Sequence, residues 1–153
     1  MRLTALGVVV ALGALACGGE KKPDQTQSQT PAAQPAAAQP AGPVVEVKMT
    51  GNGSTQAAYV PNTLTIAPGT TVRFINVSGG PHNVAFYGDS IPSGAAAALN
   101  AGMANRMDNL SGPFLTTANE NYDVSFAGAP TGTYKSYCLP HVALGMKLTI
   151  TVK

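Results

Sequence analysis

From residue 44 onward the chain consists largely of short runs in which apolar and polar residues alternate. The runs are rich in β-branched and aromatic residues and are separated by Gly, Pro and Asn, a pattern typical of half-buried strands joined by turns. Seven such runs occur, at residues 44–49, 62–66, 71–77, 82–86, 122–126, 133–138 and 147–152. So many short strands in about 110 residues predict an all-β fold of the β-sandwich type.

A single short helix is expected within this fold. An alanine-rich run at residues 95–101 lies in the long connection between the fourth and fifth predicted strands. Charged residues make up only 10% of the chain, and the formal net charge is +2. A nucleic-acid-binding face needs a concentration of lysine and arginine, so this composition excludes nucleic acid as a partner.

Residues 1–16 have the features of a secretory signal peptide. Arg2 precedes an almost wholly apolar run that is too short to span a bilayer, which needs about 20 residues. The run ends in Leu-Ala-Cys, and the small residue directly before Cys17 resembles the lipobox of bacterial lipoproteins. That resemblance implies an exported protein whose Cys17 carries a lipid on the periplasmic or extracytoplasmic side of the cell envelope. The alternative is a plain signal peptide that ends near a cysteine.

Residues 17–43 differ in composition from the rest of the chain. After Cys17 they consist mainly of Lys, Gln, Thr and Ser, followed by repeated Ala, Gln and Pro. With almost no bulky apolar side chains, this region cannot bury enough surface to offset the entropy of ordering. We expect a disordered tether, with a reach of ~80 Å if fully extended, that joins the lipid anchor to a folded domain at 44–153. It would either let the domain move between partners or only provide clearance.

The last predicted loop of the sandwich gathers three residues that bind metals. Cys138, His141 and Met146 have the spacing Cys-x-x-His-x-x-x-x-Met between two predicted strands. Two histidines, one thiolate and a weakly bound methionine define a blue-copper electron-transfer site. The chain has only one other histidine, so the fourth ligand is predicted to be His82. Asn83, the next residue, is expected to tie the two ligand loops together.

Other interpretations of these residues lead to other functions. Cys17 and Cys138 are the only cysteines, and a disulfide is possible on numbers alone, although each lies in a pattern with its own chemistry. Met103 and Met107 raise the alternative of a methionine-rich Cu(I) carrier, but such a pair more often serves packing. A copper chaperone or storage protein would use the same four ligands. A catalytic copper enzyme would need histidines for a second copper centre, and none remain, so no enzyme is expected.

Several stretches of the chain resemble plastocyanin and its cupredoxin relatives. They are Pro81-His82-Asn83-Val84 with Phe86, Ile91-Pro92-Ser93-Gly94, and the segment from Gly132 to His141 with Gly145-Met146. The resemblance covers about residues 44–153. It implies an eight-stranded Greek-key sandwich, one type 1 copper ion, and single-electron transfer between a redox donor and a redox acceptor.

The same resemblance implies how such partners dock. His141 would be the ligand at the solvent edge, and Pro81, Ala143, Leu144 and Gly145 would belong to an apolar docking surface around it. From residue 44 onward the chain has six basic and five acidic residues, so charge offers little for docking and the apolar surface should matter more. We therefore expect a monomeric electron carrier, anchored at the membrane surface, that meets its partners transiently.

Overall fold

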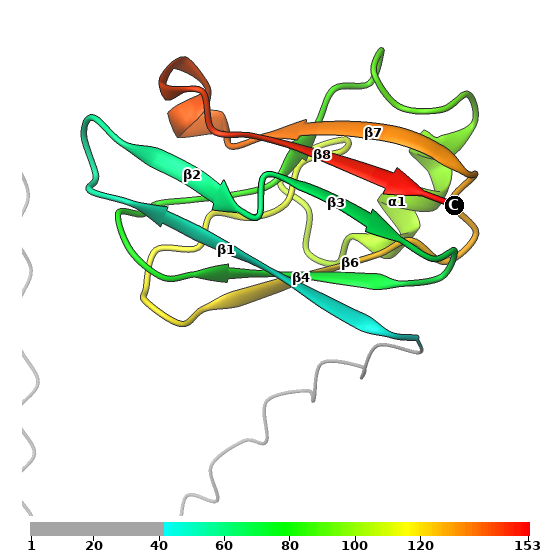
Figure 1. Cartoon of the computed structure of the whole chain (residues 1–153), viewed down its shortest axis with the longest axis horizontal. Helices are drawn as coiled ribbons and strands as arrows, with labels where there is room; N and C mark the ends of the chain where they lie inside the picture. Colours follow the sequence, from blue (N-terminus) through cyan, green and yellow to red (C-terminus); the bar gives the residue numbers. More distant parts are fainter. Residues whose placement is uncertain (1–41) are drawn as a thin grey trace, which may run out of the picture. The chain divides into compact units, whose positions relative to one another are not determined.

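The computed structural model describes residues 42–153; the signal peptide, Cys17 and all but the last residues of the expected tether lie outside the described residues. The described part contains eight strands in two layers (Figure 1). They are β1 (Val44–Gly51), β2 (Ala57–Val60), β3 (Thr63–Ile66), β4 (Thr71–Asn76), β5 (Ala85–Phe86), β6 (Asn121–Ser125), β7 (Gly132–Tyr137) and β8 (Lys147–Val152). The predicted β-sandwich is confirmed.

The two sheets each have four strands. One has the order β2-β1-β4-β6 and the other the order β3-β8-β7-β5. Strands β1 and β4 are parallel, as are β3 and β8, whereas the other pairs are antiparallel. The chain therefore changes sheet at every connection from β2 to β7, and only β1–β2 and β7–β8 are consecutive strands of one sheet, as the expected Greek-key sandwich requires.

The core follows from the alternation seen in the sequence. Val47 and Met49 of β1 and Val72 and Phe74 of β4 point inward and are fully buried, whereas Glu46 and Lys48 on β1 are exposed. Because side chains alternate across a strand, each sheet offers one apolar face, and the two faces pack together. Burial of this apolar surface is the main force that holds the sandwich.

The expected helix is present as α1 (Ala95–Gly102). Its buried residues, Ala95 and Leu99, belong to the same core, and its C-terminal end lies against β6. A Cβ atom on Gly102 would lie 2.0 Å from the carbonyl oxygen of Ser125, so only glycine allows this close approach. Over residues 42–153 no helix is both long enough and apolar enough to cross a membrane.

Two strand predictions need correction. Strand β2 was not predicted, because Ala57 and Ala58 have a low preference for strands and hide the alternation. The strand predicted at 82–86 is regular only over Ala85–Phe86. Its first part forms a single bridge, between His82 and Leu115, and Asn83 donates its backbone N–H to a cysteine sulfur instead of to a strand.

Candidate metal centre

Three of the predicted ligands converge at one end of the sandwich. One ligand atom each from His82, Cys138 and His141 lies within 4.8 Å of the others. The Cys138 sulfur is 3.7 Å from Nδ1 of His82 and 3.5 Å from Nδ1 of His141, and the two Nδ1 atoms are 3.1 Å apart. His82 and Cys138 are fully buried, and His141 is 7% exposed. The three atoms thus surround a single point shielded from water.

The predicted C-terminal ligands lie on a short loop that is closed by its own backbone hydrogen bonds. The loop leaves β7 at Cys138, forms the 3₁₀ helix η1 (Leu139–Leu144) and enters β8 directly after Met146. The Cys138 N–H donates to the carbonyl of Met146 (3.1 Å), and the Met146 N–H donates to the carbonyl of His141 (3.2 Å). Gly145 closes the turn at φ 81°, a left-handed conformation that favours glycine. Backbone bonds therefore fix this part of the site.

The orientation of the His82 ring is set by a hydrogen bond at Nε2, the nitrogen that does not face Cys138. Its Nε2 lies 2.9 Å from the backbone carbonyl of Ser78. A carbonyl can only accept, so Nε2 carries the proton and Nδ1 presents a lone pair toward Cys138 and His141. The imidazole thus has the tautomer and direction that a metal ligand needs.

Asn83 joins the two ligand loops. Its backbone N–H donates to the Cys138 sulfur (3.4 Å), and its side-chain oxygen accepts the Leu139 N–H (2.8 Å). Its side-chain nitrogen donates to the Gly112 carbonyl (3.3 Å), and its own carbonyl accepts the Tyr59 hydroxyl (2.6 Å). Every one of these groups is buried or partly buried, so the connection is shielded from competition by water.

The electrostatics of the cluster suit a cation that binds thiolate and neutral imidazole. Burial raises the pKa of the Cys138 thiol, although the backbone N–H groups of Asn83 and His141 act in the opposite direction. Burial also lowers the pKa of His141, and the neighbouring His82 lowers it further. The neutral imidazole of His141 is therefore favoured, and a bound cation would stabilise the thiolate. This donor set of two nitrogens and one soft sulfur fits copper.

Met146, the fourth predicted ligand, is fully buried and is part of the closed loop. Met103, which raised the alternative of a methionine-rich carrier, is buried in the core next to α1, whereas Met107 is 45% exposed. Cys138 is a free, buried cysteine. Met103 therefore serves packing, as expected of a methionine outside the site.

The predicted docking residues Pro81, Ala143, Leu144 and Gly145 are all exposed. Two large apolar side chains beside them, Leu139 and Val142, are also exposed and were not predicted from the sequence. Their place on the 3₁₀ helix between the predicted ligands Cys138 and Met146 was the signal that could have found them.

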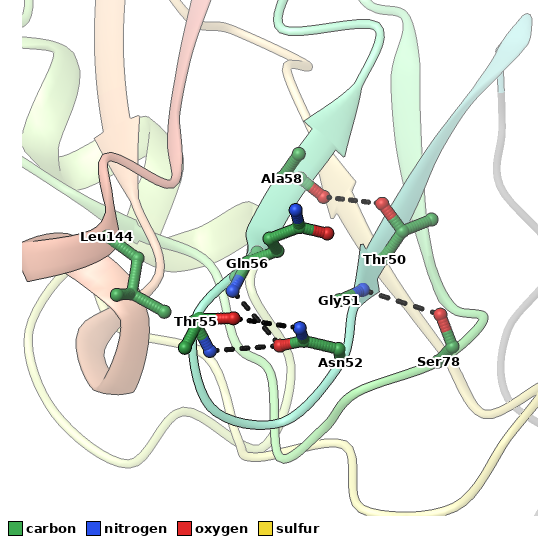
Figure 2. Close-up of a pocket in the computed structure, with 9 residues that line it drawn as sticks. Thr50, Gly51, Asn52, Thr55, Gln56, Ala58, Ser78 and Leu144 are labelled. Carbon is green, nitrogen blue, oxygen red and sulfur yellow. Dashed lines mark hydrogen bonds between the residues drawn. The ribbon is translucent and has the colours of Figure 1, made fainter.

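A shallow hollow of about 550 Å³ borders this surface at Leu144 (Figure 2). The hairpin between β1 and β2 forms most of its wall, and Asn52 holds that hairpin by accepting the N–H groups of Ser54, Thr55 and Gln56. No charged side chain lines the hollow. The surface around the ligand loop is thus apolar with a neutral polar margin.

An eight-stranded sandwich that gathers two histidines and a cysteine at one buried point has the features of a blue-copper protein. The family described as copper binding proteins, plastocyanin/azurin family, matches residues 45–153. Plastocyanin of Scenedesmus fuscus is 40% identical over 109 residues, which are 71% of this chain and 99% of that protein. Plastocyanin of Capsella bursa-pastoris is 40% identical over 102 residues, 67% of this chain and 94% of that protein.

A solved structure, the oxidized form of plastocyanin from Dryopteris crassirhizoma, has the same fold. It aligns with a TM-score of 0.55 at 28% identity and covers 71% of this chain and 100% of that chain. The chain belongs to the plastocyanin/azurin family of copper-binding proteins. It is a carrier of single electrons with one copper ion, and not an enzyme.

Proposed function

We propose that the copper of this electron carrier is held by His82, Cys138, His141 and Met146. The observation that carries the proposal is the convergence of three ligand atoms within 4.8 Å of one another in a buried position. Met146 is supported by its complete burial and by its backbone bonds to the other residues of the loop. When bound, copper supplies the one-electron couple between Cu(I) and Cu(II).

Backbone hydrogen bonds to the ligand side chains favour fast electron transfer. His82 is aligned by Ser78, and the Cys138 sulfur accepts the Asn83 N–H, so the protein itself holds these ligand atoms in position. A site held in this way rearranges little when its charge changes, which favours electron transfer. His141 is the one ligand of the three with measurable exposure, so we infer that electrons enter and leave at its edge.

The partners are inferred to dock on the apolar surface around His141. Support comes from the exposure of Pro81, Ala143, Leu144 and Gly145 and from the absence of charge in the adjoining hollow. An apolar contact of this kind suits a transient complex, because it needs no precise pairing of charges.

We propose that the protein is a monomer, which size-exclusion chromatography of the purified protein tests directly.

We further propose that the protein is exported and anchored outside the cytoplasm by a lipid on Cys17. The apolar run at residues 3–16 and the Leu-Ala-Cys ending support this. In cells that express the full chain, the protein should be found with the membrane fraction, and Cys17→Ser should move it to the soluble fraction. Release of wild-type protein into the soluble fraction would contradict the anchor.

Spectroscopy of the copper-loaded full chain tests the ligand set. We expect an intense thiolate-to-copper absorption band and a narrow EPR hyperfine splitting, both lost in Cys138→Ser. Met146→Leu should retain copper and shift the reduction potential. The matched control, Met103→Leu, changes another buried methionine and should leave the potential unchanged.

A colourless copper-loaded protein, or a colour that survives Cys138→Ser, would refute the proposed site. Loss of copper from Met146→Leu would mean that the methionine has a different role. A protein that gives up Cu(I) readily to a weak chelator would point to copper delivery or storage instead of electron transfer.

A further inference from the structure

Asn76, the last residue of β4, is a buried amide close to the metal centre. It is 2% exposed, and its side-chain nitrogen donates to the carbonyls of Leu115 (3.1 Å) and Thr117 (3.0 Å). Both acceptors lie in the connection between α1 and β6. The Asn76 side chain therefore fastens the segment 115–117 to the end of β4.

The segment fastened by Asn76 is the one that holds the backbone of His82. The His82 N–H donates to the Leu115 carbonyl (3.0 Å), and the Leu115 N–H donates to the His82 carbonyl (2.7 Å). The Leu115 carbonyl thus accepts from the Asn76 side chain and from the His82 backbone together. A continuous path of hydrogen bonds leads from β4 through Leu115 to the ligand.

The surroundings of Asn76 leave it little freedom. A Cβ atom on Gly80 would lie 3.0 Å from the Asn76 side-chain nitrogen and 3.2 Å from the Leu115 carbonyl, so the backbone before Pro81 passes directly against the amide. Among residues 42–153, the Asn76 side-chain oxygen is the one buried side-chain polar atom without a hydrogen-bond partner. The position therefore uses the two donors of the amide and not its acceptor, and a carboxylate could not replace them.

The loop between Asn76 and His82 has a second attachment on its other side. The Gly51 N–H donates to the Ser78 hydroxyl (3.3 Å), which joins the loop to the hairpin between β1 and β2 (Figure 2). Ser78 also provides the carbonyl that aligns the His82 ring. The ring direction thus depends on Ser78, whereas the backbone position depends on the segment that Asn76 fastens.

This arrangement matters because His82 is the one expected ligand outside the loop 138–146. That loop joins β7 and β8 of one sheet, whereas Asn76 ends β4 of the other sheet. We propose that Asn76 is a positioning residue for His82, which fixes its Nδ1 atom relative to the Cys138 sulfur. The inference rests on the proposed copper site.

The test compares Asn76→Leu with wild-type protein, using the copper-loaded full chain. Leucine has a similar shape but lacks both donors. We expect the Cu(II) affinity to fall about tenfold, the usual effect of removing a group that orients a metal ligand. The EPR spectrum should change, and the reduction potential should rise, because a weaker imidazole bond disfavours Cu(II) more than Cu(I).

The matched control is Tyr134→Phe, four residues before Cys138 on β7. Tyr134 is fully buried and donates its hydroxyl to the Pro130 carbonyl, so the variant loses one partly buried hydrogen bond about 13 Å along the strand from the site. It should lower the melting temperature and leave the affinity, the EPR spectrum and the potential unchanged. If Tyr134→Phe shifts these copper properties as much as Asn76→Leu does, the effect is general destabilisation and the inference is wrong.

A second readout needs no metal. In the metal-free full chain, amide hydrogen exchange at His82 and Leu115 should be at least about tenfold faster in Asn76→Leu than in wild type, beyond any change at core amides such as Val124. If Asn76→Leu does not fold, Asn76→Ser takes its place in both experiments. Unchanged exchange and an unchanged copper spectrum would overturn the inference, whereas a wild-type protein without a blue site would instead overturn the proposed function.

Discussion

Replacing Asn83 by alanine should lower the free energy of unfolding by about 2–4 kcal/mol. The Leu139 N–H, now 2.8 Å from the Asn83 side-chain oxygen, would lose its partner in a partly buried position, which costs about 1–3 kcal/mol. The longer bonds to Gly112 (3.3 Å) and Ser111 (3.4 Å) add about 0.5 kcal/mol each. For a domain of this length the total corresponds to a melting temperature lower by about 8–16 °C.

Thermal and urea unfolding of the metal-free protein measure this loss. The Asn83 backbone N–H still donates to the Cys138 sulfur in the variant, so a copper-loaded sample that folds should keep its absorption band. Ser111→Ala is the matched control, because it removes only the 3.4 Å bond and should cost at most about 1 kcal/mol. A melting temperature for Asn83→Ala within about 2 °C of wild type would refute the reasoning, as would equal losses in the two variants.

Three further predictions concern other parts of the molecule. Leu144 is exposed, and Leu144→Glu should slow self-exchange of electrons between oxidised and reduced copies at least about tenfold, because two carboxylates would face each other. This factor is equivalent to ~1.4 kcal/mol. NMR line broadening measures the rate, and an unchanged rate would remove Leu144 from the docking surface. Burial raises the pKa of Tyr122 to about 12, so the folded state keeps a proton that the unfolded state loses above pH 10. The free energy of unfolding, measured with urea, should therefore fall between pH 10 and 12. In Tyr122→Phe this free energy should fall less steeply with pH. Arg73→Ala breaks a two-bond ion pair with Asp123 and should cost about 0.5–1 kcal/mol, with a smaller loss in 1 M salt; a loss independent of salt would contradict an ionic origin.

The sequence alone predicted the parts of the site that depend on local spacing. Cys138, His141 and Met146 lie on one loop, and their order along the chain is enough to indicate metal chemistry. His82 was found by elimination, because no other histidine is available. The structure brings His82 to the same point as Cys138 and His141, and the assignment of all four residues as copper ligands stays a proposal.

The supports of His82 could not be predicted, for a physical reason. Ser78 and Leu115 act through backbone carbonyls and Asn76 through a buried amide; the Ser78 contact depends on the path of the loop 77–81, and the contacts of Leu115 and Asn76 depend on how the connection 103–120 folds against β4. No periodicity marks such contacts, because any residue type provides a carbonyl. The same lack of alternation at Ala57 and Ala58 concealed β2.

The lengths of the edge strands affect how the protein behaves at high concentration. The strands at the four sheet edges are β2, β6, β3 and β5, with four, five, four and two residues. Short edges offer few unpaired backbone groups to a neighbouring molecule and so discourage strand-to-strand aggregation. Leu139, Val142 and Leu144 can then stay exposed for brief encounters, because self-association through those side chains would find no sheet edge long enough to make it permanent.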